Sequence, residues 1–318
     1  MSAPPGFAIN PALPAPLPAD GRGSVVTIGT FDGVHRGHRE VLAEIVRRSA
    51  ATGRRSALVT FHPHPLRVVR PEHAPPLLTT ADEKKEFLAE SGLHYAIFLP
   101  FTPVLQQYPP RRFVEEILLG RLGMEELVIG YDHGFGKNRE GGVDTLRELG
   151  EEHGFRVDVV GPVGLDGEAV SSTRVRRALL EGNVTAAAVG LGRPYSFRGV
   201  VVHGDGRGRR LGFPTANLTV PEGDKLLPKE GVYAVFGWVA SSPLPGLLHL
   251  GPRPTFQGSP PTIELHLFDF DRELYGVTVR VELHTRLRDV FPFDSPKQLI
   301  RQLHEDEERG RAVLHPPR

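Results

Sequence analysis

Residues 24–38 read SVVTIGTFDGVHRGH and decide the fold of the first half of the chain. The apolar run at 25–28 predicts a β-strand, which a glycine-rich turn follows. Beyond the turn, apolar residues recur at helical spacing: Val41, Leu42, Ile45 and Val46. They predict a helix over 37–49, and the N–H groups at such a helix N-terminus are suited to bind an anion.

Two histidines, His35 and His38, lie at the mouth of this expected helix. Their rings can donate N–H groups to phosphate oxygens, and Gly37 between them lets a ligand approach the backbone. The spacing resembles the His-x-Gly-His motif of nucleotidylyltransferases, which join an AMP unit to a phosphate and release pyrophosphate. A capped turn with two hydrogen-bonded histidines is the alternative, and the preceding Gly-x-Phe-Asp-Gly-x-His pattern argues against it.

The composition of the 318 residues excludes several functional classes. The 38 basic and 38 acidic side chains leave no net charge to attract nucleic acid or an anionic membrane. There is no cysteine for a disulfide, a thiolate nucleophile or a cysteine-based metal site. No apolar run reaches the roughly 18 residues of a membrane span, and the N-terminus lacks a secretory signal. We expect a cytoplasmic protein, monomeric or weakly homo-oligomeric, that binds small molecules.

The first 186 residues fall into an arm and a domain. Residues 1–20 carry six prolines and predict an arm, either extended and poorly ordered or lying on the domain surface. Residues 21–186 alternate strands and helices, which predicts a Rossmann-like α/β domain that binds ligands at the carboxyl ends of its parallel strands. The expected strands are 25–29, 57–61, 95–99, 127–130 and 157–160, and the expected helices are 37–49, one capped by Thr80 and Glu83, 111–121, 143–153 and one after Ser172.

The pattern changes near residues 184–194, and 187–318 form a second expected domain. Short strands alternate there with glycine- and proline-rich connections, which predicts a small antiparallel β-barrel. A terminal helix over 295–309 closes the chain. The expected strands are 195–203, 231–239, 247–251, 262–268 and 277–287.

Two groups with candidate ligands follow expected strands of the first domain. FHPHP at 61–65 places His64 in a turn made rigid by prolines, and a plain surface loop is the alternative. GYDHGFGKNREG at 130–141 combines glycines with a lysine and an arginine, as suits a loop around a phosphate or nucleotide. Asp132 in that loop can accept a ribose hydroxyl or hold a metal-bound water, and a solvated mobile loop is the alternative.

A further group, VSSTRVRR at 170–177, begins a helix with Ser172 as its expected N-cap. Arg174 and Arg176 fall in the first turn, where positive charge opposes the helix dipole. A bound anion would offset this conflict, so both arginines are candidate phosphate ligands. An ordinary helix with solvated arginines is the alternative.

These four groups, in this order, resemble the FAD synthetase module of bacterial riboflavin biosynthesis proteins. The resemblance implies that four residues steady the triphosphate and the leaving group: His35, His38, Arg174 and Arg176. It implies nucleotide or flavin binding by Gly29, Phe31, Asp32, Gly33, His64, Asp132, Ser171, Ser172 and Thr173. Two departures, His133 where the family usually has phenylalanine and Gly134 at a usually larger position, put the flavin side of the pocket in question.

A dense run at 199–218, GVVVHGDGRGRRLGFPTANL, opens the second half. Its glycines let backbone N–H groups approach phosphates, and its three arginines add positive charge. Thr215 and Asn217 are two residues apart, so in an extended segment they share a face and present oxygens suited to Mg²⁺. A glycine-rich hairpin is the alternative. Farther on, Glu264 shares a strand face with His266, where it is either a general base or a solvated edge residue.

The second half resembles riboflavin kinase, a six-stranded barrel, through GFPTAN at 212–217, GVYA at 231–234, GPRPTF at 251–256 and Glu-x-His at 264–266. The resemblance implies that Thr215 and Asn217 hold Mg·ATP and that Glu264 is the base. The implied binding residues are Gly204, Gly208, Gly212, Phe213, Pro214, Thr215 and Asn217. His249, where the family commonly has asparagine, is a departure.

Together the resemblances imply a bifunctional flavin-cofactor enzyme of bacteria. Its C-terminal half would use ATP to phosphorylate riboflavin to FMN. Its N-terminal half would transfer AMP from ATP to FMN, which gives FAD and pyrophosphate. A nucleotidylyltransferase for another acceptor and a flavin-sensing regulator without catalysis are the alternatives.

Overall fold

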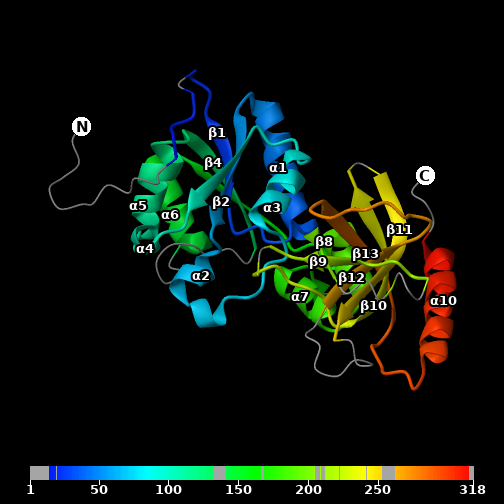
Figure 1. Cartoon of the computed structure of the whole chain (residues 1–318). Coiled ribbons are helices and arrows are strands. Elements are labelled where there is room, and N and C mark those ends of the chain that lie inside the picture. The colour runs from blue at the N-terminus through cyan, green and yellow to red at the C-terminus, as the bar shows by residue number, and fades with distance from the viewer. Residues whose placement is uncertain are drawn as a thin grey trace. The chain divides into compact units, whose positions relative to one another are not determined.

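The computed structural model describes residues 14–18, 20–131, 141–165, 168–204, 208, 212–221, 223–240, 242–252 and 262–314. The chain divides into two compact units, residues 1–170 and 171–318, which Figure 1 colours in chain order. The predicted fold class is confirmed: a Rossmann-like parallel-sheet domain, an antiparallel barrel and a terminal helix.

The first unit is built on a five-stranded sheet in the order β3-β2-β1-β4-β5. Every neighbouring pair in this sheet is parallel. The carboxyl ends of the strands therefore meet at one edge, with β1 in the centre. The strands are β1 (Ser24–Ile28), β2 (Arg55–His62), β3 (Tyr95–Pro100), β4 (Met124–Gly130) and β5 (Arg156–Val160).

Helices cover both faces of this sheet (Figure 1). Val25 of β1 packs in a core with α1 and α3, whereas Val26 and Ile28 pack in a core with the α5–α6 region. This alternation is what buries a central parallel strand on both faces. The described helices of this unit are α1 (Arg36–Thr52), α2 (Pro65–Val69), η1 (Pro71–His73), α3 (Ala81–Ala89), α4 (Pro103–Gln106), α5 (Pro110–Phe113), η2 (Val114–Leu119) and α6 (Val143–His153). Two short strands, β6 (Gly164–Leu165) and β7 (Glu168–Ala169), form a separate two-stranded sheet.

Most expected elements of the first unit are confirmed, including the capping box of Thr80 and Glu83 at the start of α3. The helix predicted over 111–121 differs in its winding. It begins as α5 and continues as the π-helix η2. There the N–H of Gly120 donates to the carbonyl of Glu115 at 3.0 Å, five residues back, which the hydrophobic period did not indicate.

The described part of the proline-rich segment, 14–18, lies on the first unit. The N–H of Leu17 donates to the Arg121 carbonyl at 2.9 Å, and its side chain packs against the larger core. The buried Arg55 donates to the carbonyls of Pro18 and Arg22, at 2.8 and 2.9 Å. These bonds fix the chain just before it enters β1.

The second unit contains a closed six-stranded barrel in the order β10-β11-β12-β9-β8-β13. All its neighbouring pairs are antiparallel. The strand β9, which contains Asn217, was not among the expected strands, because its four residues are too few to show a clear alternation. The strands are β8 (Tyr195–Val202), β9 (Ala216–Thr219), β10 (Gly231–Val239), β11 (Ser242–Gly251), β12 (Thr262–Leu267) and β13 (Thr278–Arg288).

In the described part of this unit, three helices accompany the barrel: α7 (Ser172–Leu180), α8 (Val184–Leu191) and α10 (Pro296–Val313). The side chain of Asp306 on α10 is fully buried and accepts two hydrogen bonds from the Arg288 guanidinium, which ties the helix to β13. At the other end of the unit, the N–H of Lys229 donates to the Leu179 carbonyl at 2.9 Å. The boundary predicted at 186/187 falls within α8, and the two units meet at 170/171.

Candidate active sites

The turn between β1 and α1 has a strained backbone. Phe31 and Val34 have φ angles of 47° and 41°, and Gly33 has 83°. Such conformations cost about 1–3 kcal/mol each for residues with side chains and persist only where neighbours enforce them. Here the enforcing group is Asp32, which is 1% exposed and accepts hydrogen bonds from the backbone N–H groups of Leu78 and Thr79, both at 3.0 Å.

Asp32 therefore acts as an anchor for the turn. The Thr79 hydroxyl also donates to the Asp32 carboxylate, at 3.1 Å, and accepts from the N–H of Gly33 at 3.0 Å. The contact of Asp32 with a cofactor, implied by the family resemblance, stays a prediction. Gly29 is required by packing, because a Cβ there would lie 2.9 Å from the Phe31 ring.

The two histidines stack at the mouth of α1. Their ring centroids are 3.6 Å apart, and Phe31 continues the stack at 4.6 Å from His38. His35 is the N-cap, and its Nδ1 accepts the backbone N–H of His38 at 3.3 Å, so its proton is on Nε2 when the ring is neutral. A Cβ on Gly37 would lie 3.3 Å from the His35 ring, so a side chain here would be in tight contact with the histidine stack.

His38 is held in its neutral form. Burial, followed by the nearby His35 and Lys84, lowers the pKa of His38 well below its usual value. Its Nδ1 is buried and has no hydrogen-bond partner within the described ranges. Unpaired buried polar atoms are costly, and in native proteins they often mark ligand sites.

The other groups of the first unit follow strands adjacent to β1. His64 follows β2 and is the N-cap of α2, where its Nδ1 accepts the N–H of Leu66 at 3.2 Å. The loop after β4 begins at Gly130, beside the same edge. Asp132, His133 and Gly134 lie outside the described residues. The structure thus brings the first two groups to neighbouring strand ends, and the place of the third stays a prediction.

The serine and arginine group begins α7 in the second unit. The N-cap predicted at Ser172 is wrong: Ser171 has the extended backbone of a cap, and its hydroxyl accepts the N–H of Arg174 at 3.2 Å. Ser172 is the first helical residue, and Thr173 is exposed. Arg174 falls in the first turn as predicted, whereas Arg176 falls in the second. Their convergence with the histidines stays a prediction.

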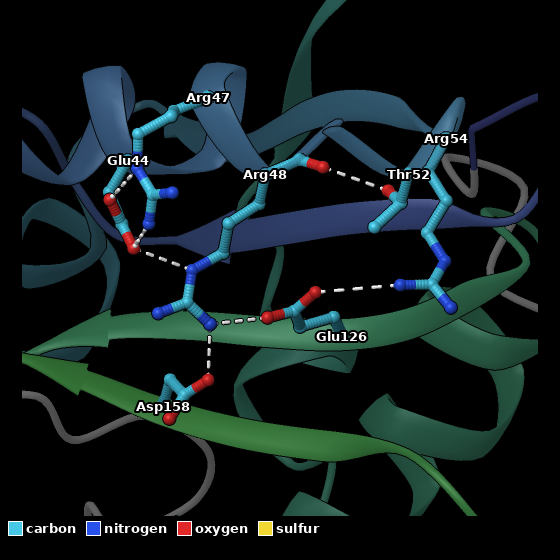
Figure 2. Close-up of polar contacts among 7 residues, drawn as sticks. All are labelled: Glu44, Arg47, Arg48, Thr52, Arg54, Glu126 and Asp158. Atoms are coloured by element: carbon cyan, nitrogen blue, oxygen red, sulfur yellow. Dashed lines mark hydrogen bonds and ion pairs between the residues drawn. The ribbon is translucent and has the colours of Figure 1, made fainter. Parts of the chain in front are cut away.

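Ion pairs hold α1, which carries the histidines, against the sheet (Figure 2). Arg48 on α1 pairs with Glu126 on β4 and with Asp158 on β5. It also pairs with Glu44, one turn earlier, at 2.6 Å. Since the Glu126 carboxylate is nearly inaccessible, Arg48 and Arg54 supply the charge that compensates it. Hydrogen bonds from Arg47 and Arg48 lower the pKa of Glu44 to about 2.

In the second unit, the oxygen-bearing residues meet on adjacent strands. Glu264 on β12 is directly opposite Asn217 on β9 and His249 on β11. The Thr215 hydroxyl donates to Glu264 at 3.4 Å, and the Thr262 hydroxyl donates to its other oxygen at 3.0 Å. The structure therefore brings Thr215, Asn217 and Glu264 together. Thr262 was missed, although its i−2 position on the same strand face as Glu264 was a usable signal.

Glycines before β9 leave room for these side chains. A Cβ on Gly204 would overlap the Asn217 amide, and a Cβ on Gly208 would overlap the Phe213 carbonyl and lie 3.0 Å from the Thr215 hydroxyl. Gly212 has a φ of 83°, which favours glycine. The three arginines of this run, Arg207, Arg209 and Arg210, lie outside the described residues.

Two histidines of the barrel hold backbone near Glu264. His266 donates its Nδ1–H to the Pro214 carbonyl at 2.7 Å, and its ring packs edge-on against the buried Phe213. His249 donates its Nε2–H to the Pro252 carbonyl at 3.1 Å. A carbonyl can only accept, so these bonds fix both tautomers. His249, at the family's asparagine position, therefore supports a turn after β11.

A pocket of about 430 Å³ opens beside this cluster. Its lining includes Asn217 and Thr262 together with His203, whose ring stacks on Tyr275 at 3.9 Å. Lys225 also lines it; this lysine is 6% exposed, lies over the Tyr195 ring and was missed by the sequence interpretation. The pocket thus combines a cation, an amide and an imidazole ring, which suits a phosphorylated aromatic ligand.

The fold and the two sites define the class of this protein as a transferase with two units. The first unit presents histidines at a helix N-terminus, as nucleotidylyltransferases do, and the second is a barrel with a cluster of oxygen donors. The FAD synthetase family matches residues 17–174, and the riboflavin kinase family matches residues 191–314. The chain belongs to the family of bifunctional riboflavin kinases/FMN adenylyltransferases, as full-length similarity to its curated members shows.

Three similar proteins illustrate this membership. The bifunctional riboflavin kinase/FMN adenylyltransferase of Escherichia coli K12 is 37% identical over 294 residues, 92% of this chain and 93% of that protein. The Bacillus subtilis protein of the same name is 34% identical and covers 90% and 91%. A crystal structure described as a macrolide-efflux protein from Streptococcus pneumoniae is 32% identical, with a TM-score of 0.83 and coverage of 91% and 94%. None of the helices in the described ranges is long and apolar enough to cross a membrane.

Proposed function

We propose that this chain carries out two consecutive ATP-dependent steps, riboflavin phosphorylation in the second unit and FMN adenylylation in the first. The observation that carries the proposal is the cluster of Glu264 on β12, Asn217 on the adjacent β9 and Thr215 just before β9. The same chain also presents stacked histidines at the N-terminus of α1. Relatives similar over nine-tenths of their length bear both activities in their names, which supports the pairing.

In the kinase step, Glu264 takes the proton from the 5′-hydroxyl of riboflavin while that oxygen attacks the γ-phosphorus of ATP. The bond to the ADP oxygen breaks, which gives FMN and ADP. Phosphoryl transfer of this kind depends mostly on positioning and on neutralising charge. The hydroxyls of Thr215 and Thr262 orient the Glu264 carboxylate toward the reacting hydroxyl.

A magnesium ion fits the oxygen donors of this cluster. Thr215 and Asn217 supply a hydroxyl and an amide oxygen, which are hard ligands of the kind Mg²⁺ accepts beside ATP phosphates. The described residues hold no group of three or more His, Cys, Asp or Glu side chains that could bind a metal alone, so phosphate oxygens would complete the set. The ion would neutralise charge on the transferred phosphate.

In the adenylyl step, a phosphate oxygen of FMN attacks the α-phosphorus of a second ATP, and the bond to pyrophosphate breaks. The nucleophile is already an anion, so no general base is needed. His35 and neutral His38 donate N–H groups to the triphosphate, and Arg174 and Arg176 contribute positive charge to the leaving pyrophosphate. The unpaired, buried Nδ1 of His38 supports this assignment.

The test is to incubate the purified chain with riboflavin, ATP and Mg²⁺, and to separate FMN from FAD by chromatography. We expect FMN to appear first and FAD to follow. FMN without FAD would point to a nucleotidylyltransferase for another acceptor, and flavin binding without turnover would point to a regulator. Omitting Mg²⁺ tests the metal, and the cytoplasmic location and monomeric or weakly homo-oligomeric state stay predictions.

A further inference from the structure

One charged side chain that the proposed steps do not use lies beneath the strained turn. Lys84 on α3 is 7% exposed, and its Nζ donates to the Thr30 carbonyl at 2.7 Å. The same carbonyl accepts the Thr60 hydroxyl of β2 at 3.0 Å. Lysines are almost never buried to this degree, and the first turns of a helix disfavour positive charge. Two unfavourable placements at one residue suggest that the turn needs this cation.

Lys84 and Asp32 hold the turn from opposite ends. Lys84 binds the carbonyl of Thr30, where the chain leaves β1, and Asp32 is bound two residues later by Leu78 and Thr79. Lys84, Leu78 and Thr79 all belong to one segment, 78–84, which contains the start of α3. This double attachment explains why the left-handed backbone at Phe31 persists.

The charge of Lys84 also acts on the histidine pair. Among the described residues, the charged or titratable groups that interact with it include Asp32 from the turn and His38 from α1, while Thr60 of β2, which shares the Thr30 carbonyl, is neutral. Burial lowers the pKa of Lys84 to about 8, against the attraction of Asp32. Lys84 in turn contributes, after burial and His35, to the lowered pKa of His38.

We propose that Lys84 is a positioning residue of the adenylyl-transfer site: its buried ammonium group fixes the Thr30 carbonyl and thereby the turn that presents His35 and His38. This inference rests on the proposed function of the first unit. Lys84 acts through the turn and the histidine pair and needs no contact with ATP. Its effect therefore falls on the rate of the adenylyl step rather than on FMN affinity.

The experiment compares Lys84→Met with Lys85→Met in the full-length enzyme. Lys85 is the neighbouring residue of α3, but its side chain is 57% exposed and pairs with Asp82 at the surface. At pH 7 we expect Lys84→Met to lower kcat for FAD formation from supplied FMN by at least about tenfold, with KM for FMN within about twofold. Riboflavin kinase turnover in both variants, and FAD formation in Lys85→Met, should stay within about twofold of the unmodified enzyme.

A pH profile and two conservative variants separate positioning from folding. FAD formation by the unmodified enzyme should fall as the pH rises through about 8, where Lys84 loses its proton. Lys84→Arg keeps its charge at this pH, so its falling limb should move to higher pH. Lys84→Gln keeps a donor for Thr30 without the charge, so it should recover part of the rate lost in Lys84→Met and show no limb between pH 7 and 9.

Three results would overturn the positioning role: an unchanged FAD rate in Lys84→Met, a limb near pH 8 that stays in place in Lys84→Arg, or a Lys84→Gln profile identical to that of the unmodified enzyme. If Lys84→Met fails to fold, the Lys84→Arg and Lys84→Gln profiles decide. Failure of the unmodified enzyme to make FAD from FMN would instead refute the proposed function. The two failures are therefore distinguishable.

Discussion

The two candidate sites place their polar groups by opposite means. At the N-terminus of α1, a strained turn and a ring stack fix His38. The buried side chains of Asp32 and Lys84 hold this turn through hydrogen bonds to backbone groups. In the barrel, Glu264 lies on a regular strand and is oriented by hydroxyls of Thr215 and Thr262. The difference matches the nucleophiles: a phosphate anion needs donors held rigidly around a developing charge, whereas a hydroxyl needs a base.

The largest effect should come from removing that base. Glu264→Gln keeps the size of the side chain and one oxygen that can accept from one of the two threonines. General-base loss typically costs about 10²–10⁴ in rate, so riboflavin phosphorylation should collapse while adenylylation of supplied FMN continues. Separate initial-rate assays on one preparation measure both activities.

Retention of more than about a tenth of kinase turnover in Glu264→Gln would contradict the assignment of the base. His266 would then be the next candidate, since its Nδ1–H is committed to Pro214 and its Nε2 is the basic nitrogen. Thr215→Val and Asn217→Ala serve as controls, because weakened Mg·ATP binding should be partly recovered at higher Mg²⁺ or ATP.

The second effect concerns the donor at the helix mouth. His38→Phe preserves a ring between Phe31 and His35 but removes the N–H group, whereas His38→Ala also opens the stack. Loss of one donor to transition-state charge costs about 10²–10³ in rate, so FAD formation should fall by this amount in both variants. FMN formation should be unaffected.

The thermal midpoint separates the two His38 variants. It should stay near that of the unmodified protein for His38→Phe and fall for His38→Ala, which leaves a cavity. Near-normal adenylylation by a folded His38→Phe variant would remove His38 from the proposed mechanism.

The sequence predicted the framework of both sites because each lies on a strongly patterned element. Alternation along β12 placed Glu264 and His266 on one face, and the strand–turn–helix pattern placed His35 and His38 at a helix mouth. What it missed are partners far away in the chain. Lys84 is 54 residues from Thr30, and no local pattern distinguishes it from the exposed Lys85 beside it.

The N-cap of α7 shows a different limit. Ser171 and Ser172 have the same capping ability, and only the backbone angles of the folded chain select Ser171. The role of Asp32 was similarly hidden, because a carboxylate in a phosphate-binding motif and one that anchors a turn look alike in sequence. Burial and the hydrogen bonds from Thr79 reveal the anchor.

The third effect tests how the barrel orients its carboxylate. Thr262→Val preserves the shape of the side chain but removes the hydroxyl that donates to Glu264 at 3.0 Å. Hydrogen bonds to charged groups contribute about 1.5–3 kcal/mol, so we expect kinase turnover to fall by about 10- to 100-fold. FAD formation from supplied FMN is the internal control. An unchanged kcat for the kinase would mean that Thr215 alone orients Glu264.

The fourth effect locates the border between the two activities. A fragment of residues 171–318 contains α7 and α8, whose contacts include the bond from Lys229 to Leu179. A fragment of 187–318, which follows the predicted boundary, lacks α7 and the first turn of α8. We expect both to make FMN and no FAD, with the shorter one melting several degrees lower. Equal melting temperatures would favour the boundary within α8, and a folded but inactive longer fragment would contradict the assignment of the kinase.

The smallest effect concerns the ion pairs that hold α1, and it should be confined to the first unit. The pKa of Glu44 is lowered from 4.5 to about 2 by its bonds to Arg47 and Arg48. A lowered carboxylate pKa adds stability above its unfolded value, and this stability is lost as the pH falls from about 4.5 toward 2. Since the side chain is 21% exposed, solvent screening reduces the contribution to about 1 kcal/mol.

Glu44→Gln should therefore lower the unfolding free energy by about 1 kcal/mol at pH 7, and the difference should shrink as the solution is acidified. Glu40→Gln, an exposed change on the same helix, controls for the removed charge. A Glu44→Gln deficit that stays constant down to pH 2.5 would show that packing, rather than the ion pair, holds this part of α1.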